Sequence, residues 1–363
     1  MAAFSAAPPS RTAPVLVLGA GGTVGGRLAD RLVASGIRVR ALARRDEVRE
    51  SWRARGFEVR LGDLAHPNSL AEAAVGCEVV YHCAGSADHG GDAQALSWLH
   101  VAGTENVLQA AAHARVRRVV LLSCADVTLH DGDRIHIKED QPMLGRPLGA
   151  WSRSKLLAEE VALRGGPSGL EVTALRPAYL WGAGDFTNLP TLCREGLAGG
   201  IRLYGAGAQL FSVAHLDNVV HGLRLAAEQP AAAGQAFHLC DGEYETAYEF
   251  FGALSSACGL PAPRRGFGPW QRTWAMLAGA RGAYVEAVRR SRGCLLDMQR
   301  AINDLGYSPV VRRGVALAEL SRFVASQGGV AGLAEHSRAT LTRADADVFD
   351  KVATQAQPAV ATT

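Results

Sequence analysis

A run of glycines near the start of the chain has the spacing of a phosphate-binding turn. Its sequence is Gly19-Ala20-Gly21-Gly22-Thr23-Val24-Gly25, and it directly follows a short apolar segment, Val15 to Leu18. Glycines let a backbone turn sharply and approach a pyrophosphate, whose charge the free N–H groups of a following helix can bind. The next residues, Val24 to Ser35, carry apolar side chains at helical spacing. This order predicts a dinucleotide-binding turn between a strand and a helix.

Lysine is rare in this chain. Lys138, Lys155 and Lys351 are the only lysines among 38 basic residues. A chain that otherwise uses arginine keeps a lysine either by chance or where a compact ammonium group on a flexible stem is needed. Lys155 lies in the best context of the three, inside the helical pattern Ser152–Leu163. We therefore treat Lys155 as a candidate functional residue.

Short apolar segments alternate with helical ones as far as residue 180, which is typical of a parallel α/β sheet covered by helices on both faces. The fold class that this predicts is α/β, a doubly wound parallel sheet of the Rossmann type. The expected strands are Val15–Leu18, Val39–Leu42, Glu58–Leu61, Val79–Cys83, Val119–Ser123, Val172–Leu175 and Ala236–Cys240, and the expected longer helices are Val24–Ser35, Gln94–Ala114 and Ser152–Leu163.

The alternation ends after Pro177, which suggests a second, smaller lobe. We expect a disordered lead-in over 1–13 and a nucleotide-binding domain over 14–177 that 205–240 rejoins. A substrate-binding lobe is expected from 178–204 and 241–330, followed by a weakly ordered tail over 331–363.

Composition limits the class of partner. The formal net charge is only +3, whereas nucleic acids and anionic membranes need a concentrated basic surface. No 18-residue apolar run and no basic leader followed by an apolar stretch occur, so we expect a cytoplasmic protein without stable membrane insertion. The seven cysteines are scattered and lack metal-ligand spacing, so neither a metal site nor a disulfide framework is expected.

Further motifs give the sequence a family resemblance. They are Gly19-x-x-Gly22-x-x-Gly25, Gly62-Asp63-Leu64, His82-Cys83-Ala84-Gly85, Val101 to Val107, Ser154 to Glu159, Leu175-Arg176-Pro177, Trp181 to Asp185 and Leu305 to Pro309. Over Val15 to Val324 the chain resembles an extended short-chain dehydrogenase/reductase of the NAD(P)-dependent epimerase/dehydratase superfamily, in particular its 3-beta-hydroxysteroid dehydrogenase branch. The resemblance implies an NAD(P)-dependent oxidoreductase with a smaller C-terminal substrate lobe.

The resemblance also implies which residues bind the cofactor. Asp63 would hydrogen-bond the adenine, Pro177 would flank the nicotinamide, and Lys155 would bind the nicotinamide ribose. Asp63 can alternatively be a simple turn residue. The whole implied set is Gly19, Gly21, Gly22, Thr23, Val24, Gly25, Arg44, Arg45, Asp63, Leu64, Ala84, Gly85, Lys155 and Pro177.

Two arginines favour NADP(H) over NAD(H). Where relatives that use NAD place an acid, this chain has Ala43 followed by Arg44 and Arg45. An acid would repel a 2′-phosphate, whereas a guanidinium group can bind one through two hydrogen bonds. The alternative is a solvated helix start beside Asp46 and Glu47.

The catalytic set departs from the family pattern. The resemblance implies a Tyr four residues before Lys155, and Trp151 stands there instead. A Ser or Thr is implied after the fifth strand, where the best register gives Cys124 and a one-residue slip gives Ser123. His100 replaces the usual Asn.

An indole N–H cannot release its proton near neutral pH, so Trp151 cannot act as a general acid, which is worth roughly 10²- to 10⁴-fold in rate. We therefore expect hydride acceptors that are protonated only after hydride transfer or not at all, such as conjugated rings that spread the new negative charge. Alternative proton donors are Tyr179, His82, Cys124 and His100, each of which can equally be structural.

Aromatic residues in the second lobe suggest an apolar, ring-containing or acyl-chain substrate of sterol, isoprenoid or secondary-metabolite type. Trp151, Tyr179, Trp181 and Phe186 are the expected substrate contacts, and Phe211, Phe267, Trp270, Trp274 and Met276 follow in the same lobe. Ordinary core packing is the alternative for all of them, and residues 267–288 could instead touch a membrane surface.

Three functions remain open from sequence. The first is an NADPH-dependent reductase; the others are a non-redox isomerase, dehydratase or rearrangement enzyme that retains bound NADP, and an inactive NADP-binding partner. An inactive partner whose catalytic residues had been lost would be expected to lose Lys155 as well. Its retention in a lysine-poor chain therefore argues against the third function. A homodimer is expected by analogy alone.

Overall fold

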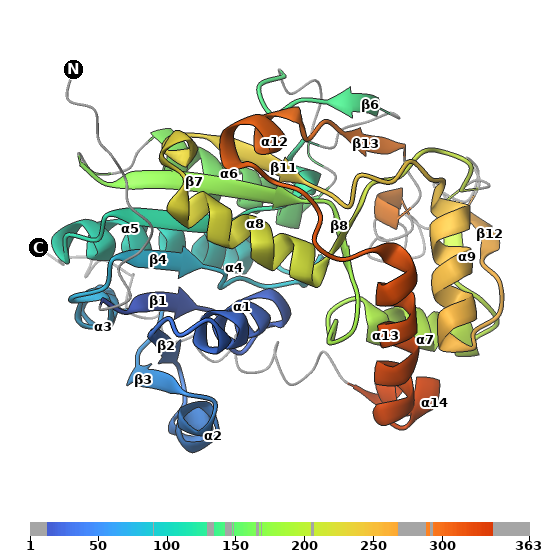
Figure 1. The fold of residues 1–363 in the computed structure, drawn as a ribbon, viewed down its shortest axis with the longest axis horizontal. Coiled ribbons are helices and arrows are strands. Elements are labelled where there is room, and N and C mark those ends of the chain that lie inside the picture. Colours follow the sequence, from blue (N-terminus) through green and yellow to red (C-terminus); the bar gives the residue numbers. More distant parts are fainter. Residues whose placement is uncertain are drawn as a thin grey trace, which may run out of the picture.

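A seven-stranded sheet forms the centre of the fold, with strand order β11-β7-β5-β4-β1-β2-β3 and all neighbours parallel (Figure 1). This confirms the predicted fold class. The computed structural model describes residues 13–89, 91–128, 134–141, 147, 149–164, 167, 169–204, 207–267, 288–290 and 293–336. The strands are β1 (Val15–Leu18), β2 (Val39–Ala43), β3 (Phe57–Leu61), β4 (Val79–His82), β5 (Arg118–Leu122), β7 (Glu171–Pro177) and β11 (Ala236–Leu239).

Both faces of the sheet are covered, as continuous apolar strands require. Successive side chains of a strand point to opposite faces. Val15 and Val17 of β1 accordingly share a buried cluster with helices α1 (Thr23–Ala34) and α8 (Leu216–Glu228). Leu16 and Leu18 pack on the other side with α3 (Pro67–Ala74), α5 (Gly103–His113) and α6 (Ala150–Arg164).

The second lobe has a core of its own. Helices α7 (Leu189–Leu197), α9 (Ala247–Cys258) and α13 (Arg313–Ser326) pack with the parallel strand pair β8 (Tyr179–Trp181) and β10 (Val213–His215). Two further parallel pairs join β9 (Arg202–Tyr204) to β12 (Arg264–Phe267), and β13 (Cys294–Leu296) to β6 (Arg134–Ile137). Helix α14 (Gly329–Glu335) packs on α7 with Leu333 fully buried, so the lobe continues beyond residue 330, where the weakly ordered tail was expected to begin.

Side chains from α1 join the nucleotide-binding domain to the lobe. The Arg27 guanidinium donates to both carboxylate oxygens of Asp217 on α8, at 2.7 and 2.6 Å, and to the carbonyl oxygen of Ala183, at 3.0 Å. One turn earlier, the hydroxyls of Thr23 and Thr187 lie 3.0 Å apart. The first helix therefore contacts the segment that follows β8.

The helical segment expected over Gln94–Ala114 is not one regular helix. It consists of α4 (Ala93–Ser97), a π-helical turn (Trp98–Ala102) and α5. The Thr104 hydroxyl donates to the carbonyl oxygen of His100 at 2.6 Å, a side-chain bond that competes with regular backbone pairing. Among the described residues, no helix is both long enough and apolar enough to cross a membrane.

Candidate active site

Several predicted site residues meet at the carboxyl edge of the sheet, where open α/β sheets bind ligands. The turn after β1 lies against the loop after β4, because a Cβ atom placed on Gly19 would be 2.7 Å from the amide nitrogen of Ala84. Helix α6 reaches β5 through Lys155, whose Nζ donates to the carbonyl oxygen of Leu122 at 2.8 Å. The ends of β1, β4 and β5 and the start of α6 therefore form one region.

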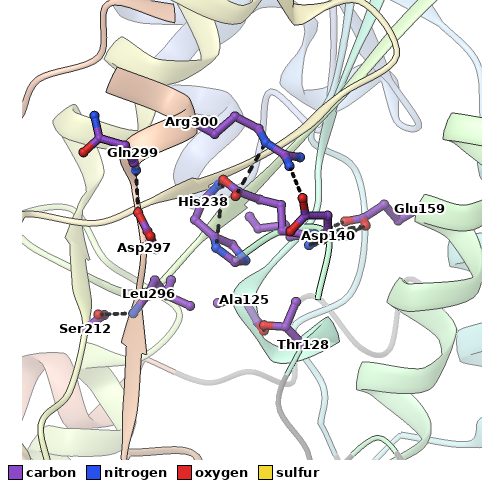
Figure 2. A network of polar contacts seen from close by, with 12 residues as sticks. Ala125, Thr128, Asp140, Glu159, Ser212, His238, Leu296, Asp297, Gln299 and Arg300 are labelled. Atoms are coloured by element: carbon purple, nitrogen blue, oxygen red, sulfur yellow. Dashed lines mark hydrogen bonds and ion pairs between the residues drawn. The ribbon is translucent and has the colours of Figure 1, made fainter. Parts of the chain in front are cut away.

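A buried ion pair fixes α6 against the sheet (Figure 2). Arg176 of β7 donates through Nε to both carboxylate oxygens of Glu159, each at 3.0 Å, and through Nη1 to the carbonyl oxygen of Glu139. The Glu139 carboxylate accepts from the backbone N–H of His238 on β11 at 2.8 Å and lies 3.8 Å from Nε of Arg300. Helix α6 is thus tied to β7, and the segment around Glu139 joins β7 to β11.

The glycine turn has the geometry of a pyrophosphate cradle. Gly19 has φ of 83°, a conformation that favours glycine, and a Cβ on Gly25 would lie only 2.3 Å from the carbonyl oxygen of Gly19. Helix α1 begins at Thr23 after Gly22, which has no side chain to cap it. The first N–H groups of a helix have no intrahelical partner and can bind an anion. These residues therefore fit a dinucleotide pyrophosphate.

The two arginines expected to select the cofactor follow β2 and are exposed. Arg45 also precedes the short 3-10 helix Asp46–Val48 that leads into α2 (Arg49–Ala54), and Asp46 pairs with Arg49 at 2.7 Å. Both the phosphate-binding role and the solvated helix start are compatible with this position of Arg44 and Arg45.

Asp63 and Leu64 lie in the turn after β3. The Asp63 carboxylate accepts from the backbone N–H of Ala65 at 2.8 Å, which is the turn role that the sequence left as an alternative. The carbonyl oxygen of Leu64 accepts from the Asn106 side chain at 2.8 Å. The turn after β3 is thereby joined to α5.

The loop after β4 begins with Ala84 and Gly85 and is held by His100. The backbone N–H of Ser86 donates to Nε2 of His100 at 3.1 Å, so the ring proton lies on Nδ1, which is 2.8 Å from the Ser154 hydroxyl on α6. A Cβ on Gly85 would lie 3.2 Å from the same Nε2. His100 therefore holds this loop against α6.

Trp151 is turned inward, with 9% of the residue exposed. Its indole N–H donates to the carbonyl oxygen of Ser86 at 2.5 Å. Its ring lies 4.0 Å from the His89 ring, between centroids, and edge-on to His100 at 6.3 Å. The only donor of the indole is thus used to hold the loop after β4.

The ammonium group of Lys155 is buried, and the Cys124 and Cys83 thiols and the Glu159 carboxylate act on its charge. Burial lowers the pKa of the Lys155 ammonium group. Burial also raises the pKa of the Cys83 and Cys124 thiols to about 12 in each case, against a smaller opposing effect of Lys155. Both cysteines therefore remain protonated at neutral pH. Ser123 is buried, and within the described part of the chain its hydroxyl has no hydrogen-bond partner.

Two of the alternative proton donors are uncharged. Burial, together with the charge of Lys155, lowers the pKa of His82 to about 3, and burial keeps the pKa of His100 well below its usual value. Nε2 of His82 pairs with the Thr104 hydroxyl at 3.1 Å. At neutral pH both rings are neutral imidazoles, which are poor acids.

Arg289 also reaches this region, and the sequence analysis missed it. Its Nε lies 2.7 Å from a carboxylate oxygen of Asp126, in the turn after β5, and its Nη1 lies 2.9 Å from Nε2 of His89. Its guanidinium carbon is 5.4 Å from the centre of the Tyr179 ring. The only signal in the sequence was a pair of arginines, Arg289-Arg290, in a stretch without regular pattern.

The remaining predicted substrate contacts are dispersed. Pro177 is the last residue of β7. Tyr179, two residues later, packs on Phe211 with ring centroids 5.7 Å apart. Trp181 is buried in the lobe and donates to Asp241 at 2.7 Å, whereas Phe186 stacks on His336 at 4.8 Å. The side chain of Phe267 and the residues Trp270, Trp274 and Met276 lie outside the described part of the chain.

Comparisons with known proteins agree with this geometry. Residues 15–240 match the model of the NAD dependent epimerase/dehydratase family. The chain is 33% identical over 246 residues to 4-hydroxy-2-methyl-3-oxo-4-farnesyl-3,4-dihydroquinoline-1-oxide ketoreductase of Stigmatella aurantiaca, covering 68% of this chain and 73% of the relative. It is 28% identical over 375 aligned positions to 3-beta-hydroxysteroid dehydrogenase of Mycolicibacterium neoaurum, covering 96% and 95% of the two chains.

The fold is similar to that of DesIV, a dTDP-glucose 4,6-dehydratase from Streptomyces venezuelae whose crystal structure contains NAD. The TM-score is 0.69 with 23% sequence identity, over 86% of this chain and 97% of the other.

We predict that Gly25→Ala destabilises the protein by about 1–3 kcal/mol, because the new methyl group would overlap the carbonyl oxygen of Gly19 and force the backbone to move. Chemical denaturation measures this. The matched control is Gly252→Ala on α9, where no atom lies within 4 Å of the new Cβ and a gain of about 0.5–1 kcal/mol is expected. Equal stability of the two variants would contradict the close approach.

Proposed function

Because this chain belongs to the NAD dependent epimerase/dehydratase family, we propose that it is an NADPH-dependent reductase acting on an apolar, ring-containing or conjugated carbonyl compound. The coarser statement, that it is an NAD(P)-dependent oxidoreductase of the short-chain dehydrogenase/reductase type, follows from the family and its named relatives. The observation that carries the proposal is the inward-facing Trp151 one helical turn before Lys155, with its N–H bonded to Ser86.

The residues at the sheet edge fit a nicotinamide dinucleotide. The turn Gly19–Gly25 would bind the pyrophosphate, Ala84 and Gly85 would line the nicotinamide, and Lys155 would bind its ribose. When bound in its reduced form, this cofactor supplies the hydride. The chain itself would orient the acceptor.

We assign NADPH as the preferred cofactor on the chemistry of Arg44 and Arg45. Both are exposed at the end of β2, where an adenosine ribose lies in dinucleotide-binding folds. A guanidinium group pairs with a phosphate through two parallel hydrogen bonds.

The states of Trp151, Cys124 and His82 favour a conjugated acceptor, and the phenol of Tyr179 is the alternative donor. Trp151 cannot release a proton, Cys124 is held as a neutral thiol, and His82 is a neutral imidazole. An acceptor that spreads its new negative charge over a conjugated system needs protonation late or not at all. The two relatives named above are a quinoline-oxide ketoreductase and a hydroxysteroid dehydrogenase, which supports a ringed substrate.

We predict that the full chain oxidises NADPH stoichiometrically with conjugated ring ketones or enones, at least about 10²-fold faster than with saturated ketones of similar size. The loss of reduced-nicotinamide absorbance and the product yield are measured together. Product without net NADPH loss would indicate a non-redox enzyme. Tight NADPH binding without turnover across the panel would indicate a binding protein.

For the cofactor preference, we expect Arg44→Asp to raise the dissociation constant of NADPH about 10- to 100-fold and to leave that of NADH nearly unchanged. Calorimetric titration with each cofactor measures both constants. Arg53→Asp, the same charge change on the exposed face of α2, is the control and should preserve the ratio. The preference is wrong if Arg44→Asp weakens both cofactors equally.

Trp151→Tyr should restore a phenol where the family has one. The expected result is a gain of about 10-fold or more in reduction of saturated ketones, since general acid catalysis becomes available. Steady-state kinetics measures the gain, and Trp98→Tyr on the half-exposed π-helical turn is the control. No gain in a folded, NADPH-binding variant would place the proton route elsewhere.

A further inference from the structure

Both backbone polar groups of Ser86 are bonded to side chains that depart from the family pattern. The N–H of Ser86 donates to Nε2 of His100 at 3.1 Å, and its carbonyl oxygen accepts from the Trp151 indole N–H at 2.5 Å. The Ser86 hydroxyl accepts from the backbone N–H of Asp88 at 3.0 Å. Ser86, two residues after Ala84, is therefore held through each of its polar groups.

The same two side chains are joined to each other through α6. Nδ1 of His100 donates to the Ser154 hydroxyl at 2.8 Å, and that hydroxyl donates to the carbonyl oxygen of Trp151 at 2.9 Å. The two rings also meet edge-on, with centroids 6.3 Å apart. The hydrogen bonds therefore form a closed cycle that runs from Ser86 through His100, Ser154 and Trp151 back to Ser86. Bonds in such a network depend on one another.

Most of this cycle is buried. His100 and Ser154 are each 3% exposed, and Trp151 is 9% exposed. A buried polar group that loses its partner costs free energy, because water cannot replace the lost bond. Burial therefore favours the closed cycle, which fixes the Ser86 peptide relative to α6.

The length of the side chain at position 100 decides whether it reaches Ser86. The bond to Ser86 uses Nε2, the far nitrogen of the imidazole ring, whereas Nδ1 faces Ser154. An asparagine, which the family resemblance implies here, ends near the position of Nδ1 and would bond to Ser154 alone. A glutamine is one methylene longer and can bring an acceptor oxygen to the position of Nε2. The bond to the Ser86 amide thus depends on the histidine of this chain.

We propose that His100 and Trp151 act together as one positioning unit, which fixes the Ser86 peptide and thereby holds Ala84 and Gly85 in place for the nicotinamide end of the cofactor. This inference rests on the proposed function and deepens it. Each of the two departures from the family depends on the other, because the peptide is fixed only when its N–H and its carbonyl oxygen are both bonded. A loop that is already fixed binds a ligand more tightly than one that samples several positions.

The test compares two ligands that differ only at the nicotinamide. Calorimetric titration of the full chain measures the dissociation constants of NADPH and of 2′-phospho-ADP-ribose, which lacks that ring. Trp151→Phe removes the indole donor but keeps an aromatic ring, and His100→Asn removes the reach to Ser86. Each is expected to weaken NADPH binding about 3- to 10-fold, the effect of one lost hydrogen bond, and to leave the affinity for 2′-phospho-ADP-ribose within about 2-fold.

The double variant, Trp151→Phe with His100→Asn, distinguishes one unit from two independent contacts. Independent contacts multiply their effects on the NADPH dissociation constant, whereas one unit gives a double effect no larger than that of the stronger single variant. His100→Gln, which restores the reach, should return the NADPH affinity to within about 2-fold of wild type. Trp98→Phe, at a half-exposed position of the same π-helical turn, is the control and should alter the affinity for neither ligand.

Hydrogen exchange at the Ser86 amide tests the unit without any ligand. Trp151→Phe leaves the bond between this amide and His100 untouched, yet it should speed exchange about 3- to 10-fold if the two side chains act together. This measurement decides the question if His100→Asn fails to fold. Unchanged exchange in Trp151→Phe, multiplied effects in the double variant, or equal weakening of both ligands overturns the proposal.

Failure of the proposed function gives a different pattern. If the wild-type chain binds neither NADPH nor NADH, the dinucleotide site is rejected and the positioning role is rejected with it. If the chain binds NADPH but reduces no carbonyl compound, the reductase function alone is rejected, and the affinity and exchange measurements still determine whether His100 and Trp151 act as one unit.

Discussion

The buried pair between Arg176 and Glu159 is the interaction on which the arrangement of the site depends. It removes two charges from water, which is tolerable only when hydrogen bonds satisfy both groups, as they do here. Because Glu159 lies one turn after Lys155 on α6, the pair determines where the helix meets the ends of β5 and β7. The positions of Lys155 and Trp151, and through Trp151 that of the loop after β4, follow from it.

Burial holds several groups of the resulting site in their uncharged forms. Burial keeps the thiols of Cys83 and Cys124 protonated and the ring of His82 neutral, for the same reason that it lowers the pKa of Lys155. Charge in the region comes from Lys155, and from Arg289 and Asp126, whose side chains lie 2.7 Å apart. Orientation and electrostatics are therefore the means by which this chain can act on a bound acceptor.

Local pattern predicted the strands and the glycine turn, because both depend on neighbours in sequence: β1 begins and ends at Val15 and Leu18 as expected. The contacts of Arg289 could not be predicted, since they join it to residues more than a hundred positions away. Trp181 shows that the type of a side chain does not by itself determine its role. Its aromatic character suggested a substrate contact, but whether an indole packs in a core or faces a ligand depends on tertiary structure, and here it bonds to Asp241.

The contact between Thr23 and Thr187 joins the glycine turn to the lobe. Thr23 is the first residue of the helix whose N-terminus faces the expected pyrophosphate, and Thr187 belongs to the lobe. With Arg27 bridging the same two parts one turn later, the dinucleotide seat and the lobe share side chains. A displacement of either part would therefore strain the contacts that Thr23 and Arg27 make across the boundary.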